Sequence, residues 1–281
     1  MPADVLKNLV RAVVPRPVRN WLRSPSRSAQ WLWDTTRFSF GAVETLNCSP
    51  GRSIVCHPHA YEVACRSQVA DPEQREEFQN FLAHCGATML LFDLGAHFGL
   101  FSLAAAQYGG RAVAVDPSPM AAKMIATQVK LNRCSDRIWI RQAAVSDVPG
   151  ELNMLSAGVF SDGYFRLVSG RPRRELSLVK ATTIDQMAQE FGAPTHIKVD
   201  VEGHEAAVLR GGRATLSSAS PVLFLELHSE MITSDGGDPC AALEELAKLG
   251  YSTFSLRGGP ISRSEALQKP ISRIVAKRVH G

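Results

Sequence analysis

The chain of 281 residues lacks the features that mark several classes of protein. No apolar run approaches the roughly 18 residues that a membrane span requires. The N-terminus shows no compact apolar segment followed by a small-residue cleavage site, as a secretory signal would. No two of the six cysteines are spaced C-x-x-C, which disfavours a zinc site or a disulfide framework. We therefore expect a cytoplasmic protein with reduced thiols and no transmembrane segment.

An excess of charge of one sign is also missing. The formal net charge is only +4, with 45% hydrophobic and 21% charged residues, which is typical of a globular protein and argues against disorder. A dedicated nucleic-acid-binding protein usually carries a denser basic face. We therefore expect no nucleic-acid partner.

Residues 1–50 differ in composition from the rest of the chain. They concentrate basic and tryptophan residues, namely Arg11, Arg16, Arg19, Arg23, Arg27, Trp21, Trp31 and Trp33. The pattern predicts an N-terminal helical arm that packs its tryptophans on the domain, and weak contact of residues 1–33 with a membrane surface is the alternative. We expect the boundary after residue 50, with residues 51–281 forming one domain.

From residue 88 onward, short apolar runs alternate with helical patterns. Strands are predicted at 89–94, 112–115, 138–140, 197–200 and 222–227, with closing strands at 251–256 and 274–277. Helices are predicted at 98–108, 120–131, 184–191, 205–216 and 240–249. This alternation is typical of an α/β fold with a doubly wound, mainly parallel sheet covered on both faces.

A glycine-containing turn follows the first of these strands. Its sequence is Asp93-Leu94-Gly95-Ala96-His97-Phe98-Gly99. A dinucleotide site usually shows three glycines as G-x-G-x-x-G, whereas this turn has two, directly after an acid. Asp93 would repel a pyrophosphate but attract an ammonium group, and Asp116 ends the next strand, where an acid accepts hydrogen bonds from ribose hydroxyls. The combination predicts a nucleoside ligand with a cationic end, such as S-adenosylmethionine.

Four segments resemble, in order, the motifs of the FkbM-type methyltransferases. They are Asp93-Leu94-Gly95-Ala96-His97-Phe98-Gly99-Leu100-Phe101-Ser102-Leu103, Val115-Asp116-Pro117-Ser118-Pro119, Ala144-Val145-Ser146-Asp147 and Lys198-Val199-Asp200-Val201-Glu202-Gly203-His204-Glu205. The similarity covers roughly residues 71–228, and Asp116 departs from it, since many members carry Glu there.

This resemblance implies a class I methyltransferase (Rossmann-like) fold and methyl transfer to a hydroxyl oxygen, often on a sugar or a natural product. It also implies roles for single positions. Asp93, Gly95, Ala96 and Gly99 would line the methionine end of the cofactor. Asp116 would hold the ribose, and Gln142, after the third strand, would lie by the adenine edge.

Acidic and histidine residues end the fourth and fifth predicted strands. Asp200 and Glu202 follow one strand, and Glu226 and His228 lie at the end of the other. Since neighbouring parallel strands end at the same edge of a sheet, these four side chains should converge on one cleft. Such a cluster could deprotonate a hydroxyl directly, or it could hold a divalent metal through mixed ligands. We favour direct base catalysis slightly.

Three functions follow from these patterns. The first is an S-adenosylmethionine-dependent O-methyltransferase with a small-molecule or carbohydrate acceptor. The second is an NAD-dependent oxidoreductase, against which the missing third glycine and Asp93 count. The third is a non-catalytic nucleoside-binding module, against which the acidic cluster counts. The acceptor and the oligomeric state stay open.

Overall fold

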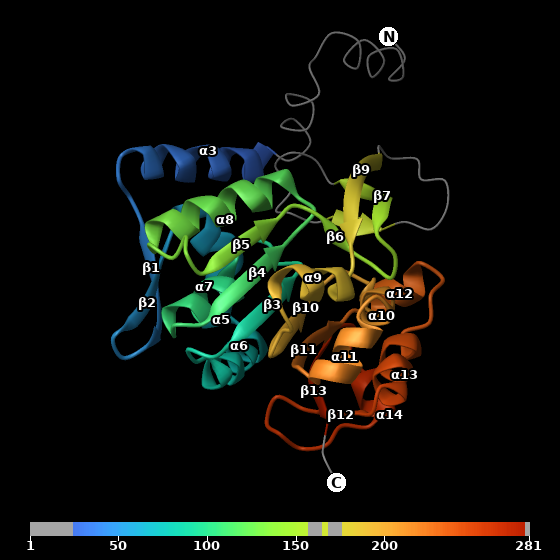
Figure 1. Ribbon diagram of the computed structural model, residues 1–281. Helices are drawn as coiled ribbons and strands as arrows, with labels where there is room; N and C mark the ends of the chain where they lie inside the picture. Colours follow the sequence, from blue (N-terminus) through green and yellow to red (C-terminus); the bar gives the residue numbers. More distant parts are fainter. Residues whose placement is uncertain (1–24, 157–164, 168–175, 279–281) are drawn as a thin grey trace, which may run out of the picture.

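Seven strands form the central sheet of the computed structural model, which describes residues 25–156, 165–167 and 176–278 (Figure 1). They are β3 (Leu90–Leu94), β4 (Arg111–Val115), β5 (Ile138–Arg141), β10 (His196–Val199), β11 (Val222–Leu227), β12 (Tyr251–Phe254) and β13 (Ser272–Arg278). Their order is β12-β13-β11-β10-β3-β4-β5. The predicted parallel strands and both closing strands are thus present.

The sheet is parallel except at β13, which runs antiparallel to both β11 and β12. Strand order reverses between β3 and β10, where Asp93 pairs with Lys198. In doubly wound sheets, ligands bind beyond the carboxyl ends of the strands at such a reversal. The topology therefore predicts a ligand site at the carboxyl ends of β3, β10 and β11.

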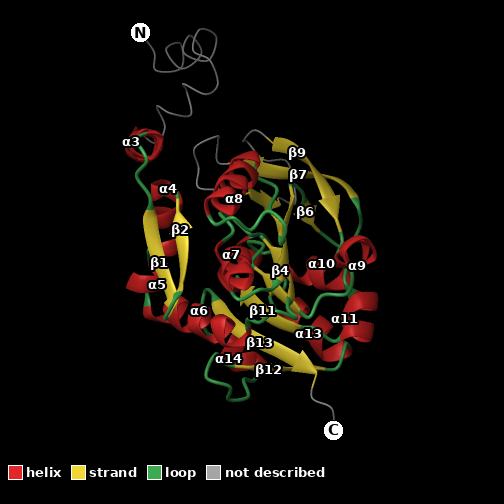
Figure 2. Cartoon of the chain, turned by 60° about the vertical axis from the view of Figure 1, so that its left-hand side comes forward, coloured by secondary structure: helices red, strands yellow, loops and turns green. Residues whose placement is uncertain are grey.

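Helices cover both faces of this sheet (Figure 2). On one face lie α6 (Pro72–His84), α7 (Leu100–Gln107) and α8 (Pro119–Leu131); on the other lie α9 (Ile184–Phe191), α10 (Glu205–Arg210), α11 (Arg213–Ala219) and α13 (Cys240–Lys248). Successive residues of β3 enter opposite layers: Leu91 packs in the first core, and Leu90 and Phe92 pack in the second. Burial on both faces explains why the strand sequences are almost continuously apolar.

A second sheet lies where the sequence predicted only a connection. It comprises β6 (Ala144–Val145), β7 (Gly150–Ser156), β8 (Phe165–Leu167) and β9 (Leu176–Thr182), in the order β6-β9-β7-β8. Its strands show little alternation between buried apolar and exposed polar residues, and Leu178 in β9 is 62% exposed. In β7 and β9, Met154 is the only buried residue among those whose burial is described, so the hydrophobic pattern that reveals a strand is weak.

The N-terminal part contains α3 (Pro25–Ser39) and a hairpin of β1 (Glu44–Ser49) and β2 (Arg52–Cys56). The expected boundary after residue 50 falls in the turn of this hairpin, whose buried residues join the α6–α7 core. The division into arm and domain stays a prediction. The expectation that tryptophans pack on the domain is wrong for Trp33, which is 62% exposed because it lies on the outer side of α3.

Residues 1–24, and with them most of the basic arm, lie outside the described part of the chain. The predicted membrane contact of residues 1–33 therefore stays a prediction. Among the described residues, no helix has the length and apolar character needed to cross a membrane. The short helices α4 (Pro58–Ala60), α5 (Ser67–Ala70), α12 (Ser229–Ser234) and α14 (Arg263–Ala266), with the π-helix η1 (Tyr61–Cys65), complete the fold.

The close approach of β3 to β10 gives a first prediction. Gly95 has φ +79°, and a Cβ there would lie 1.7 Å from the carbonyl oxygen of Asp200. We expect Gly95→Ala to lower the free energy of unfolding by about 2–5 kcal/mol, from left-handed strain plus overpacking. Gly51, with φ +76° and open space around it, is the matched control. Gly51→Ala should cost only about 1–2 kcal/mol, and equal losses in urea denaturation would contradict the close contact.

Candidate functional site

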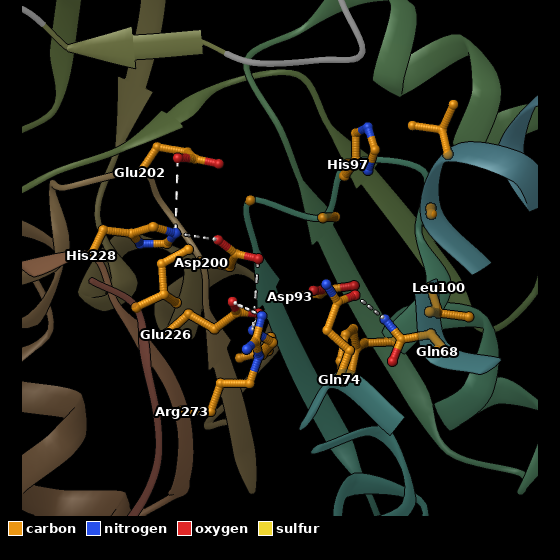
Figure 3. Close-up of a pocket in the computed structure, with 17 residues that line it drawn as sticks. Gln68, Gln74, Asp93, His97, Leu100, Asp200, Glu202, Glu226, His228 and Arg273 are labelled. Carbon is orange, nitrogen blue, oxygen red and sulfur yellow. Dashed lines mark hydrogen bonds and ion pairs between the residues drawn. The ribbon is translucent and has the colours of Figure 1, made fainter. Parts of the chain in front are cut away.

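A cavity of about 280 Å³ opens at the carboxyl ends of β3, β10 and β11 (Figure 3). It is bounded by the glycine loop, defined here as residues 95–99, by the ends of β10 and β11, and by η1, α5 and α6. Asp93, Gly95 and Ala96 line it together with all four predicted catalytic residues. The cavity therefore joins the predicted cofactor loop to the predicted chemical cluster.

Two residues of this cavity have unusual backbone conformations. His97 has φ 52° and Glu202 has φ 53°. Positive φ is uncommon outside glycine, and such residues cluster at functional sites because the surrounding structure must hold them there. The observation supports this cavity as the functional site independently of its charges.

Three backbone N–H groups of the glycine loop donate hydrogen bonds within the protein. The amides of Gly95 and Ala96 both donate to the carbonyl oxygen of Val115 at 2.9 Å, and that of His97 donates to Asp116 at 2.9 Å. A pyrophosphate is normally bound by free N–H groups at such a turn. Because these three are already satisfied, the loop does not fit a dinucleotide, which counts against the oxidoreductase reading.

The two predicted cofactor acids are buried and hydrogen-bonded. Asp93 accepts hydrogen bonds from the hydroxyl of Ser102 at 2.6 Å and from its amide at 3.1 Å. Asp116 accepts one bond on each oxygen, from the amides of His97 and Ser118. Burial raises the pKa of both carboxyls, that of Asp116 to about 7. Each Asp116 oxygen keeps lone-pair capacity, which fits ribose hydroxyl donors.

Gln142 is separated from this cavity. It is exposed and borders a second hollow of about 470 Å³, shared with Arg141, Thr182 and Gln186. Neither Asp116 nor Gly99 forms part of the cavity wall, although both shape the loop that does. The structure thus brings together three of the six predicted cofactor residues and supports a fourth, Asp116, through the loop.

A buried lysine lies beneath the predicted catalytic residues. Lys198 is 1% exposed, and its Nζ lies 2.8 Å from Glu226, 3.1 Å from Glu77 and 3.8 Å from Asp200. Burial alone would lower the pKa of Lys198, but the three carboxylates outweigh it and raise the pKa above its ordinary value. Lys198 is therefore a permanent cation at the centre of three acids.

Glu226 is held from both sides. Its second oxygen lies 3.0 Å from Arg273, which also contacts Glu77 at 3.0 Å. Against the effect of burial, Lys198 and Arg273 lower the pKa of Glu226 to about 2, whereas burial raises that of Glu77 to about 7. Glu226 is thus a fixed anion whose two oxygens are both occupied by cations.

His228 connects the remaining acids. Its Nδ1 lies 2.7 Å from Glu205, and its Nε2 lies 3.6 Å from Asp200 and 3.8 Å from Glu202 (Figure 3). Burial opposes protonation, but the hydrogen bond to Glu205 and the charge of Asp200 raise the pKa of His228 to about 9. At neutral pH the ring is an imidazolium. Burial and the Glu226 carboxylate raise the pKa of Asp200 well above its ordinary value.

Three of the same residues are also candidate ligands for a divalent metal. Asp200, Glu226 and His228 each offer one ligand atom within 4.8 Å of the others. However, both Glu226 oxygens already face cations, so Glu226 could bind a metal only by giving up one of its ion pairs. The donor set therefore fits a divalent cation poorly.

The predicted catalytic residues do converge, but sequence reasoning missed their partners. Glu77, Lys198, Arg273 and Glu205 were not identified as a buried charge network. A signal was present: Lys198 interrupts an apolar strand, and Glu77 lies directly before Phe78 on the apolar side of α6. Charged residues are almost never fully buried unless they are paired. Each of these two positions therefore indicates a buried partner of opposite charge.

Comparisons with known proteins show the family of the chain. A model of the methyltransferase FkbM domain matches residues 93–253, more than half of the chain. A ribosomal protein L11 methyltransferase of Desulfitobacterium hafniense is 33% identical over 81 residues, which are 28% of this chain and 26% of that protein. The chain thus spans about a quarter of that relative.

Two solved structures are similar to the chain at low sequence identity. Methyltransferase FkbM from Methylobacillus flagellatus KT is 16% identical, with a TM-score of 0.48 over 78% of this chain and 54% of that one. Precorrin-6y C5,15-methyltransferase from Geobacter metallireducens is 11% identical, with a TM-score of 0.43 over 73% and 88%. The family match, together with the sheet order, confirms the predicted class I methyltransferase fold.

The buried network gives a second prediction. Lys198→Met keeps the length of the side chain but leaves Glu77 and Glu226 without their shared cation. We expect a loss of about 3–5 kcal/mol in the free energy of unfolding at pH 8. At pH 5 the loss should be smaller, because Glu77, with a pKa of about 7, is then protonated in the folded protein. Urea denaturation at both pH values measures this.

The control for that prediction is Lys130→Met, since Lys130 lies on the exposed side of α8. It should change stability by less than about 0.5 kcal/mol. A Lys198→Met protein as stable as the control at pH 8 would show that the network is not needed for folding.

Proposed function

Since the chain belongs to the methyltransferase FkbM domain family, we propose that it is an S-adenosylmethionine-dependent methyltransferase. We further propose that its acceptor is a hydroxyl group of a sugar or of another small hydroxylated metabolite. One observation carries this proposal: the glycine loop and a cluster of carboxylates with an imidazolium line the same cavity. The six free cysteines support a reducing, cytoplasmic location.

The residues present fit this cofactor. S-Adenosylmethionine supplies an electrophilic methyl group on a positively charged sulfur. The cavity offers carboxylates to a cation, namely Asp93, Asp200 and Glu202, whereas the first three amides of the loop, at residues 95–97, are already hydrogen-bonded within the protein. Asp116 retains acceptor capacity for ribose hydroxyls on the far side of the loop. Both ends of the ligand therefore find groups of suitable charge.

Asp200 is the proposed proton acceptor. An alcohol becomes a good nucleophile only as its proton leaves, so a base must be positioned beside it. Asp200 keeps about a third of its side chain exposed to the cavity, and its raised pKa makes it a stronger base than an ordinary aspartate. Glu226 has neither property, because its oxygens are paired and its pKa is low. The hydroxyl proton would therefore pass to an Asp200 oxygen.

His228 is the proposed positioning residue for Asp200. Glu205 holds Nδ1, so that Nε2 faces Asp200 and Glu202. As an imidazolium, it keeps two neighbouring carboxylates close together without their full mutual repulsion. This assignment differs from the simplest expectation, in which His228 itself accepts the proton.

A third prediction tests the ribose site. Asp116→Ala should weaken the binding of S-adenosylhomocysteine about 10- to 100-fold, since a hydrogen bond to a charged group contributes about 1.5–3 kcal/mol. Affinity for the wild-type protein should also fall as the pH drops below about 7, where Asp116 becomes protonated. Isothermal titration calorimetry measures both effects. Asp136→Ala, at an exposed site, is the control, and equal affinities of the two variants would place the ribose elsewhere.

A fourth prediction tests the chemical step. A screen of monosaccharides, methyl glycosides and small phenols for methyl transfer would first supply an acceptor. Asp200→Asn should then lower turnover at least about 100-fold, while the affinity for S-adenosylhomocysteine falls less than about tenfold, because Asp93 and Glu202 still attract its ammonium. Near-normal turnover would show that Asp200 is not the base.

The pH profile separates the roles of Asp200 and His228. Turnover should fall at low pH as Asp200 becomes protonated, starting above the usual range for an aspartate, and should fall again above about pH 9 as His228 loses its proton. His228→Gln should remove the alkaline limb.

Incubation with EDTA should leave turnover unchanged, because the proposed mechanism uses no metal. A loss of turnover that Mg²⁺ or Mn²⁺ restores would contradict this mechanism.

A further inference from the structure

One side of the cavity is formed by residues that precede the matched family domain. Residues Val63 and Ala64 of η1, Gln68 of α5 and Gln74 of α6 face the cavity, whereas the family match begins at residue 93. Figure 3 shows Gln68 and Gln74 beyond Asp93, on the opposite side of the view from Glu202 and His228. A π-helix such as η1 is rare and frequently occurs at functional sites.

Gln68 carries a buried polar atom without a protein partner. The residue is only 9% exposed, and its Oε1 is buried and accepts no hydrogen bond. Its Nε2 donates to Oε1 of Gln74 at 3.3 Å. Leaving a buried acceptor unsatisfied costs about 1–3 kcal/mol, so such a group calls for an explanation, and a ligand that supplies the donor is one.

The two amides together present one acceptor and one donor. Since Nε2 of Gln68 is used by Gln74, the free groups are Oε1 of Gln68 and Nε2 of Gln74, which makes no hydrogen bond within the described part of the chain. An α-amino acid group has the complementary pair, an ammonium donor and a carboxylate acceptor. A hydroxyl group alone would use only half of this arrangement.

The electrostatics of the cavity favour the same orientation. Four carboxylates and three cations line the cavity, so that its net charge is negative, which attracts an ammonium and repels a carboxylate. Gln68 is buried on the inner side, whereas Gln74 is only half-buried, so that its free N–H lies nearer solvent. An ammonium at Gln68 and a carboxylate at Gln74 therefore each lie where the charge is tolerated.

We infer that Gln68 and Gln74 bind the amino-acid end of the methyl donor, Gln68 accepting from the α-ammonium and Gln74 donating to the α-carboxylate. This inference rests on the proposed function. It places one end of the cofactor site on α5 and α6, outside the matched domain. The Gln68–Gln74 pair makes no contact with the adenosine in this arrangement, which gives the test its selectivity.

The experiment compares two ligands that differ only at this end. S-Adenosylhomocysteine carries the amino-acid group, and 5′-methylthioadenosine lacks it. We expect Gln68→Met to weaken S-adenosylhomocysteine at least about tenfold and to leave the affinity for 5′-methylthioadenosine within about twofold, both measured by calorimetry. The melting temperature should not fall, because the variant removes an unsatisfied buried oxygen. Gln79→Met, on the exposed side of α6, is the matched control.

Gln74→Met is the second variant, at a half-buried position where the substitution should leave folding intact. It should show the same selective loss for S-adenosylhomocysteine. Unchanged affinity in both variants, or equal weakening of both ligands, would overturn the inference while leaving the methyltransferase proposal intact. A wild-type protein that binds neither ligand would overturn the proposed function, and this inference with it.

Discussion

The charge of Lys198 is the constraint on which the site depends. A lysine in the middle of a doubly covered strand is costly to bury unless carboxylates surround it, and here they come from three separate elements, α6, β11 and the end of β10. Arg273 is then needed as a second cation, because the carboxylates of Glu77 and Glu226 would otherwise share the single positive charge of Lys198. The network fixes the ends of neighbouring strands relative to α6 and so shapes the floor of the cavity.

A second constraint acts on the glycine loop, where backbone amides that could have held an anion are turned inward. Two of them meet the carbonyl of Val115 and a third meets Asp116. The loop is thereby stiffened by the very groups that a dinucleotide site would leave open. Under the proposed function Asp116 has a double role, because it completes the loop and still offers lone pairs to a nucleoside. The loop thus selects for a ligand without phosphates through its hydrogen bonds as well as through the charge of Asp93.

The sequence predicts the sheet well because burial on both faces leaves a direct signature of continuous apolar runs. It predicts the convergence of Asp200 and Glu226 for a topological reason, since parallel neighbours end at one edge. The pairings of Glu77 and Arg273 could not be predicted in the same way. They join residues 196 positions apart, and no local pattern records which distant acid meets which base. The strands β7 and β9 were not predicted because they bury few side chains and so show only a weak hydrophobic pattern.

The cavity is lined partly by residues outside the matched family domain, and these residues can change its shape. The loop and the acids at the strand ends belong to residues 93–253, whereas Glu77, Gln68 and Arg273 lie outside that range. Under the proposed function, the matched part supplies the glycine loop and the proton acceptor. The outer part closes the cavity, and through Glu77 and Arg273 it adds one carboxylate and one guanidinium to the charge network of the floor. Because Glu77 and Arg273 are tied to Lys198 inside the domain, changes in the outer elements must preserve that charge balance. Divergence is therefore freer at uncharged wall positions such as Val63 and Ile271, where substitution alters the shape of the cavity without leaving a buried ion unpaired.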